Sequence, residues 1–238
     1  MADRGSESHP SSPEVHWAFS ERSDGDFAVT APEGSLHADR HRLAARPWTW
    51  LHQVHGSIVV VVNAAGEHAG VDADAAVTAV AGAVLAVQTA DCAPVLLWGW
   101  TAAGAPVIGA AHAGWRGLYD GVVENTVAAL RRLGASEVHA RLGPCISAPA
   151  YEFSATDLTT MALRFGPDVV AGTADGAPAL DMAEAVRSAL RSARVDAGAT
   201  VTPDCTATAL TAQGEPRFWS WRARADIGRQ ASVIWIEP

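Results

Sequence analysis

The stretch VLAVQTADCAPVLLWGWTAAGAPVIGAAHAGWRG, residues 84–117, decides the fold because three short apolar runs follow one another within it. The runs cover residues 84–87, 95–98 and 107–110, and Pro94 and the Ala103-Gly104 pair separate them. Apolar runs of four residues between such turn signals are typical of strands rather than helices. The sequence therefore predicts three consecutive short strands.

Further elements are predicted on both sides of this stretch. The β-branched run at residues 58–62 indicates a buried strand, and residues 121–133 place four aliphatic side chains on one helical face. We also expect a strand pair within residues 15–30 around an Asp24-Gly25 turn, helices at 37–45, 154–165 and 178–193, a loop at 169–178, and strands at 138–142 and 232–236. Strands that arrive in groups argue against regular βαβ alternation and predict a single α+β domain with mixed sheets.

Composition excludes several classes of protein. The 238-residue chain has a formal charge of −9, which disfavours binding to nucleic acid, and no apolar run approaches the roughly 20 residues that cross a bilayer. Residues 1–13 are polar without a signal-peptide core, so we expect a disordered tail before one domain at residues 14–238. The three cysteines are odd in number and far apart, which favours a reducing compartment. A cytoplasmic protein of undetermined oligomeric state is expected.

Three segments with reactive side chains lie at the edges of apolar runs, where a strand would give way to a loop. They are Gln53-Val54-His55-Gly56, Ala90-Asp91-Cys92-Ala93-Pro94 and His112-Ala113-Gly114-Trp115-Arg116-Gly117. Taken singly, a strand-end histidine or a cysteine is more often structural. Taken together, the segments offer two imidazoles and a thiol, which suit a borderline-soft metal such as zinc. The same groups can also form a Cys/His nucleophilic pair.

The number of ligands indicates which kind of metal site this is. Three protein ligands with an open fourth position are typical of catalytic zinc, whereas structural zinc needs a fourth ligand at close spacing, and the chain has no C-x-x-C. Copper(II) binds such donors more tightly than zinc, so a single copper ion is the less favoured alternative. The nine histidines include no His-x-His pair, which argues against a multi-copper cluster.

Several motifs make the chain recognisable. They are WLHQVHG at residues 50–56, TADCAPVLL at 89–97 and GAAHAGWRGL at 109–118, with weaker matches in LGPCI at 142–146, FWSWR at 218–222 and GRQA at 228–231. The chain resembles the laccase-domain or polyphenol oxidoreductase proteins, now more often described as purine nucleoside phosphorylases. The resemblance covers about residues 50–238. It implies a four-layer α/β/β/α sandwich in which His55, Cys92 and His112 hold one zinc ion per chain.

The resemblance also implies a reaction, and the chemistry of that reaction suggests roles for further residues. The reaction is cleavage of adenosine or a related purine nucleoside by phosphate, with adenosine deamination as a companion activity. Asp91, beside the ligand Cys92, is suited to move protons, Arg116 is suited to hold phosphate, and Gln53 is the third catalytic candidate. A purely structural ion pair between Asp91 and Arg116 is the alternative interpretation. The candidates for substrate binding are Arg22, Trp115, Arg222 and Arg229.

Other functions stay open on the sequence alone. A Cys/His hydrolase would use Cys92 as nucleophile and His112 or His55 as base, for example in the editing of cell-wall precursors. A copper-binding, polyphenol oxidase-like protein is a further alternative. A non-catalytic binding module is the last, because residues 23–27 depart from the family's usual N-terminal pattern.

Overall fold

Two mixed five-stranded sheets make up the centre of the protein. The computed structural model describes residues 2–9, 12–195 and 203–238. The first sheet has the order β1 (Asp3–Glu7), β2 (Val15–Phe19), β12 (Gln230–Ile236), β6 (Val84–Thr89) and β3 (Trp48–Trp50). The second has the order β4 (Val59–Val62), β5 (Ala75–Thr78), β8 (Pro106–Ala113), β7 (Ala93–Thr101) and β9 (Ala135–Leu142). Neighbouring strands are antiparallel except for β3 with β6 and β4 with β5.

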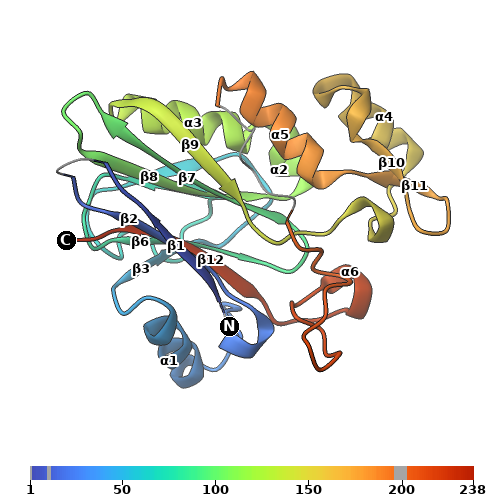
Figure 1. The fold of residues 1–238 in the computed structure, drawn as a ribbon, viewed down its shortest axis with the longest axis horizontal. Coiled ribbons are helices and arrows are strands. Elements are labelled where there is room, and N and C mark those ends of the chain that lie inside the picture. Colours follow the sequence, from blue (N-terminus) through green and yellow to red (C-terminus); the bar gives the residue numbers. More distant parts are fainter. Residues whose placement is uncertain (1, 10–11, 196–202) are drawn as a thin grey trace.

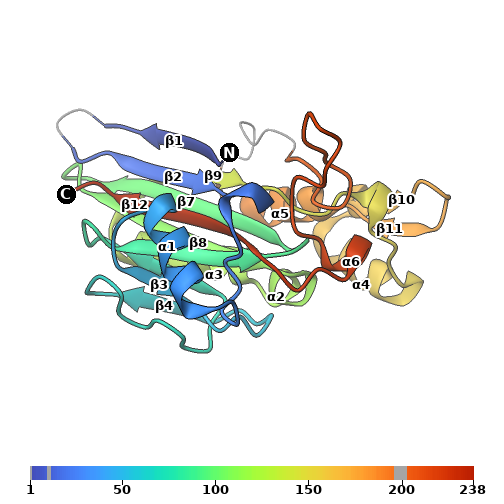
Figure 2. The same ribbon diagram turned by 90° about the horizontal axis from the view of Figure 1, so that it is seen from below.

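Helices cover the outer face of each sheet. Figure 1 shows α1 (Glu33–Leu43) on one side of the stacked sheets and α3 (Val122–Arg132) and α5 (Met182–Ser192) on the other. The remaining helices are α2 (Trp115–Tyr119), α4 (Ala155–Phe165) and α6 (Trp221–Arg224), and β10 (Val170–Gly172) pairs with β11 (Pro178–Leu180) in a small hairpin. Figure 2 shows α6, α4 and this hairpin at one end of the molecule. The expected α+β sandwich of four layers is confirmed.

The side chains of the central strands alternate between two apolar cores. On β7, Leu96 and Trp98 pack between the sheets, while Val95 and Leu97 pack under the helices. Strand β8 alternates in the same way, with Ile108 between the sheets. A third core lies between α1 and the first sheet. Burial on both faces is the reason that these strands are apolar throughout rather than alternating with polar residues.

Several local predictions differ from the structure. Within residues 15–30 only β2 is a strand; the Asp24 carboxylate accepts a hydrogen bond from the Glu21 N–H (2.8 Å) and closes a 3-10 turn at Arg22–Asp24. Residues 178–180 form β11 instead of helix, because the helix begins after Asp181, whose carboxylate accepts from the Glu184 N–H (2.9 Å). The expected loop at 169–178 contains β10. The helices expected at 121–133 and 154–165 are confirmed.

The expected disordered tail is wrong over Asp3–Glu7. These residues pair with β2 as an antiparallel edge strand. The Arg4 guanidinium also donates to the carbonyl of Leu43 (2.8 Å), which ties the strand to the end of α1. The strand pairing of the first sheet therefore includes residues before residue 14.

No helix among the described residues is long and apolar enough to cross a membrane.

Leu96→Ala should lower the free energy of unfolding by about 3 kcal/mol, because Leu96 is fully buried between the sheets and its truncation leaves a cavity. Urea unfolding followed by circular dichroism measures the loss. The matched control is Leu163→Ala on α4, where the side chain is 85% exposed and the expected change is within about 0.5 kcal/mol. Equal losses in the two variants would contradict the assignment of the inter-sheet core.

Candidate metal centre

The three candidate ligands come from segments at one end of the two sheets. His55 lies in the connection from β3 of the first sheet to β4 of the second, and Cys92 lies in the turn from β6 of the first sheet to β7 of the second. His112 is near the end of β8. The ligand atoms all lie within 4.8 Å of one another, and His55 Nε2 is 3.8 Å from Cys92 Sγ. The structure thus brings together residues that are far apart in the sequence.

A buried aspartate just before β5 organises this cluster. The Asp74 carboxylate accepts hydrogen bonds from the N–H groups of Val54 (3.3 Å), His55 (3.0 Å) and Gly56 (2.7 Å). Its Oδ1 atom also lies 2.8 Å from Nδ1 of His112. An N–H at Nδ1 donating to this carboxylate leaves Nε2 of His112 as the free donor atom for a metal. One side chain therefore fixes both the turn that carries His55 and the ring orientation of His112.

The surroundings of the cluster favour charged forms of its members. Burial alone raises the pKa of Asp74, but hydrogen bonds from His112 and from the backbone N–H of Gly56 lower it overall. Burial also acts against the Cys92 thiolate, yet the neighbouring His112 and His55 lower the pKa of Cys92 to about 6. Desolvation lowers the pKa of His112, while Cys92 and Asp74 together raise it to about 9. The thiolate is the form of cysteine that binds a metal, whereas His112 would have to give up its Nε2 proton to become a ligand.

Two unusual backbone conformations and one glycine shape the cluster. His55 and Asp91 have positive φ angles of 59° and 103°, which non-glycine residues rarely adopt. A Cβ atom on Gly114 would lie 2.6 Å from Cδ2 of His55 and 3.4 Å from Sγ of Cys92, and so would enter the space between the ligands. Two imidazoles and a thiolate around a space that only glycine leaves free fit zinc or copper.

A cavity of about 580 Å³ lies over the cluster. Its lining includes the cluster itself and a mixture of aromatic, apolar and basic side chains. The sequence-predicted residues among them are Gln53, His55, Asp91, Cys92, His112, Trp115, Arg116, Arg222 and Arg229. A cavity of this size suits a small organic ligand.

The side chains of Asp91 and Gln53 are both held by other parts of the chain. The Asp91 carboxylate accepts from Thr206 Oγ1 (2.7 Å) and from the backbone N–H of Arg222 (2.6 Å). The Gln53 amide donates to the carbonyl of Gln88 (2.7 Å) and accepts from its N–H (2.8 Å), which fixes the His55 segment to β6. Both residues line the cavity, and their proton-transfer roles stay predictions.

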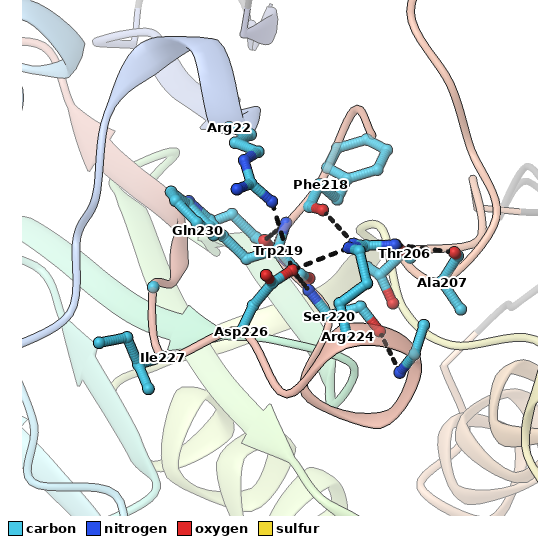
Figure 3. Close-up of polar contacts among 12 residues, drawn as sticks. Arg22, Thr206, Ala207, Phe218, Trp219, Ser220, Arg224, Asp226, Ile227 and Gln230 are labelled. Atoms are coloured by element: carbon cyan, nitrogen blue, oxygen red, sulfur yellow. Dashed lines mark hydrogen bonds and ion pairs between the residues drawn. The ribbon is translucent and has the colours of Figure 1, made fainter. Parts of the chain in front are cut away.

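The basic candidates differ in position. The Arg116 guanidinium stacks on Trp115 at 4.4 Å, and Arg222 donates to the carbonyl of Glu152 (2.9 Å). Arg229 donates to three carbonyls of its own segment, at residues 226–228. Arg22 is not among the cavity-lining residues; its guanidinium lies over Trp219 and 3.4 Å from the Asp226 carboxylate, as Figure 3 shows. A direct substrate contact of Arg22 stays a prediction.

Sequence reasoning missed Asp74 and much of the cavity wall. Asp74 stands directly before the apolar run of β5, and an acidic residue at the start of a buried strand was the available signal. Tyr151, Trp221 and Ile227 also line the cavity. Burial raises the pKa of Tyr151, so its hydroxyl stays protonated there. Trp221 lies in the FWSWR motif, but the sequence carries no local signal that it or the other two residues reach the cavity, because their approach depends on the long-range packing of their loops.

Comparison with known proteins places this geometry in a family. The family model described as multi-copper polyphenol oxidoreductase laccase matches residues 18–237. The chain belongs to the multi-copper polyphenol oxidoreductase laccase family. A Mycobacterium tuberculosis relative named purine nucleoside phosphorylase is 36% identical over 223 residues, with 90% of this chain and 84% of the relative covered. A Streptomyces coelicolor relative of the same name is 35% identical, with 94% and 96% covered.

Solved structures of two further proteins share the laccase-family fold. A Neisseria meningitidis protein is 28% identical with a TM-score of 0.75, and 99% of each chain is covered. A Geobacillus stearothermophilus protein has a TM-score of 0.76 at 24% identity, with 94% of this chain and 92% of that chain covered. The second likeness is one of fold alone.

Gly114→Ala should weaken zinc binding by about tenfold or more, because the added methyl group enters the space between His55 and Cys92. Titration against a chelator of known zinc affinity measures the loss. Gly34→Ala in α1 is the matched control, since a Cβ there meets no atom within 4 Å. Unchanged zinc affinity in Gly114→Ala would show that the metal does not occupy this space.

Proposed function

We propose that the protein is a zinc-dependent purine nucleoside phosphorylase that cleaves adenosine- or inosine-type nucleosides with phosphate and also deaminates adenosine. The observation that carries the proposal is a His/Cys/His cluster on a cavity that three arginine side chains, Arg116, Arg222 and Arg229, also line. The names of the relatives from M. tuberculosis and S. coelicolor support the substrate class. The cytoplasm stays the proposed location.

Phosphorolysis requires the protein to bind phosphate next to the ribose of the nucleoside. A phosphate oxygen attacks the ribose C1′ atom, the C1′–N bond breaks, and the purine leaves with the bonding electrons and takes up a proton. The arginines of the cavity, Arg116 first and then Arg222 and Arg229, suit the phosphate, because a planar guanidinium binds two oxygens at once. Zinc, when bound, supplies a Lewis acid that stabilises negative charge in the reaction. The positioning of phosphate and ribose is the contribution of the protein side chains.

Asp91 fits an indirect role in this proposal. Its carboxylate holds the backbone N–H of Arg222, and its neighbour in the chain is Cys92. It therefore links the metal ligand to the start of α6, whose residues form part of the cavity wall. We infer that Asp91 orients the cavity wall by holding the backbone of Arg222. Any proton that its carboxylate moves would pass through the hydroxyl of Thr206, which is hydrogen-bonded to it.

The number of metal-ligand groups bears on whether this chain could be a multi-copper oxidase, as the description of its family suggests. Among the residues that the structure describes, the group of three or more His, Cys, Asp or Glu side chains close enough to hold a metal is His55, Cys92 and His112. A multi-copper oxidase needs several such ligand groups to hold its coppers. One three-ligand site supports single-metal chemistry over laccase chemistry for this chain.

A Cys/His hydrolase is the second candidate, and one contact favours it. Asp74 holds Nδ1 of His112 at 2.8 Å in a buried pair, and His112 adjoins Cys92. A nucleophile, a base and a carboxylate that orients the base form the arrangement that activates a thiol. Metal content separates the two candidates, because a hydrolase of this kind works without zinc.

Zinc-loaded protein incubated with adenosine and phosphate should release adenine and ribose 1-phosphate, and inosine where deamination occurs. Cys92→Ala should lose zinc and all of these products together, because one of three ligands is removed. Chromatography of the products and metal analysis of both proteins test this outcome. Bound zinc with none of the three products would sink the phosphorylase proposal and favour a binding module. Activity in zinc-free protein that thiol alkylation abolishes would favour the hydrolase.

Arg116→Gln should raise the KM for phosphate about tenfold, because the guanidinium that pairs with phosphate is replaced by a neutral amide. Initial rates at varied phosphate and saturating nucleoside measure the change. Arg132→Gln, on the exposed face at the end of α3, is the control and should leave the KM for phosphate unchanged. The same KM in both variants would remove Arg116 from the phosphate site.

A further inference from the structure

We propose that an apolar ledge made of Val29, Trp221 and Ile227 receives the heteroaromatic base of the substrate, and that Asp226 is the positioning residue that fixes this ledge. The identity of the base as a purine rests on the proposed function. All three ledge residues line the cavity over His55, Cys92 and His112. Two of them belong to the segment at residues 219–230, whose contacts hold it in one shape.

The segment at residues 219–230 is closed by hydrogen bonds between its two ends. The Gln230 side chain accepts from the Trp219 N–H (2.9 Å) and donates to the Trp219 carbonyl (3.3 Å). Inside this closure, Ser220 and Asp226 bond twice: the Asp226 N–H donates to the Ser220 carbonyl (3.2 Å), and the Asp226 carboxylate accepts from the Ser220 N–H (2.9 Å). Compact loops whose ends are joined in this way frequently carry function.

Asp226 connects this segment to the rest of the protein. Oδ2 of its carboxylate lies 3.0 Å from Nε of Arg224 and 3.4 Å from Nη1 of Arg22. Arg224 in turn donates to the carbonyls of Phe218, Thr206 and Ala207. Figure 3 shows the carboxylate among these donors, with Ile227 lying apart from them. Burial raises the pKa of Asp226, but the Ser220 N–H and Arg224 lower it overall, which keeps the carboxylate charged.

The result is a fixed loop that presents apolar side chains to solvent. Trp221 is 57% exposed, Ile227 is 79% exposed and Val29 is 40% exposed, although all three lie on one cavity. Exposed large apolar side chains that line one cavity mark a site that a ligand covers. A loop already held in its bound shape binds such a ligand without a further loss of conformational entropy.

The place of the ledge indicates the chemistry of its ligand. It shares the cavity with the metal cluster and with Arg116, whose charge suits an anion, so one ligand that meets both has an apolar part and an anionic or polar part. The flat, weakly polar faces of a heteroaromatic ring suit Trp221 and Ile227, and stacking on an aromatic side chain tolerates different bases. A nucleoside bound next to phosphate matches this description, because its base is the weakly polar part and the phosphate is the anionic part.

Ile227→Ala and Trp221→Ala should each weaken the binding of adenosine and inosine about tenfold, because each removes apolar area that the base covers. The same variants should change the affinity for ribose 1-phosphate, which carries no base, by less than about twofold. Calorimetric titration with inosine in phosphate-free buffer measures the binding without phosphorolysis or deamination, and adenosine is titrated into zinc-free protein. Asp226→Asn should give the same selective loss with unchanged zinc content, and under turnover should raise the KM for nucleoside with little change in kcat.

Leu163→Ala, another exposed apolar truncation but away from the cavity, is the control and should bind every ligand like the parent protein. Equal losses for nucleoside and ribose 1-phosphate would overturn the ledge, since they would show that the segment only supports the fold. Unchanged nucleoside affinity in Ile227→Ala and Trp221→Ala, or no nucleoside binding by the parent protein, would also overturn it. Nucleoside binding that needs the ledge, without any phosphorolysis, would count against the proposed function alone.

Discussion

The buried carboxylate of Asp74 is the constraint on which the candidate site depends. A fully buried charge is stable only when it is hydrogen-bonded, and Asp74 meets this need with three backbone N–H groups and one imidazole nitrogen. Its own carbonyl accepts from the His112 N–H (2.7 Å), so both its main chain and its side chain hold that histidine. The turn at His55, with its positive φ, has its shape because this carboxylate gathers the N–H groups around it.

The sandwich explains why such a carboxylate can be buried at that place. Strand β5 lies between β4 and β8 in the second sheet, and residues just before it meet the last residues of β8. The first sheet covers the inner face of the second, and α3 covers the outer face. Water is therefore excluded from the Asp74 side chain, which is 0% exposed, so its carboxylate must bond to protein groups.

Much of the fold was predictable because its signals are local. The apolar runs that form β6, β7 and β8, and the Ser154 cap and amphipathic face of α4, act within a few residues. The clustering of His55, Cys92 and His112 could be predicted from the sequence, because each residue lies where an expected strand ends. Asp74 was not, because its role depends on strands that pair only in the folded sheet. The ledge was not either, since Asp226 meets Arg22 across 204 residues of sequence.

The course of the chain through the site has a consequence for folding. His55 and Cys92 lie on two passages from the first sheet to the second and are 37 residues apart in sequence. The loop between these two ligands is longer than the close ligand spacings of a zinc finger, so closing it early costs more chain entropy unless strand pairing has already brought its ends together. We therefore expect the ligand set to assemble after the two sheets have stacked. Capture of a metal at this cluster would then report completed folding rather than nucleate it.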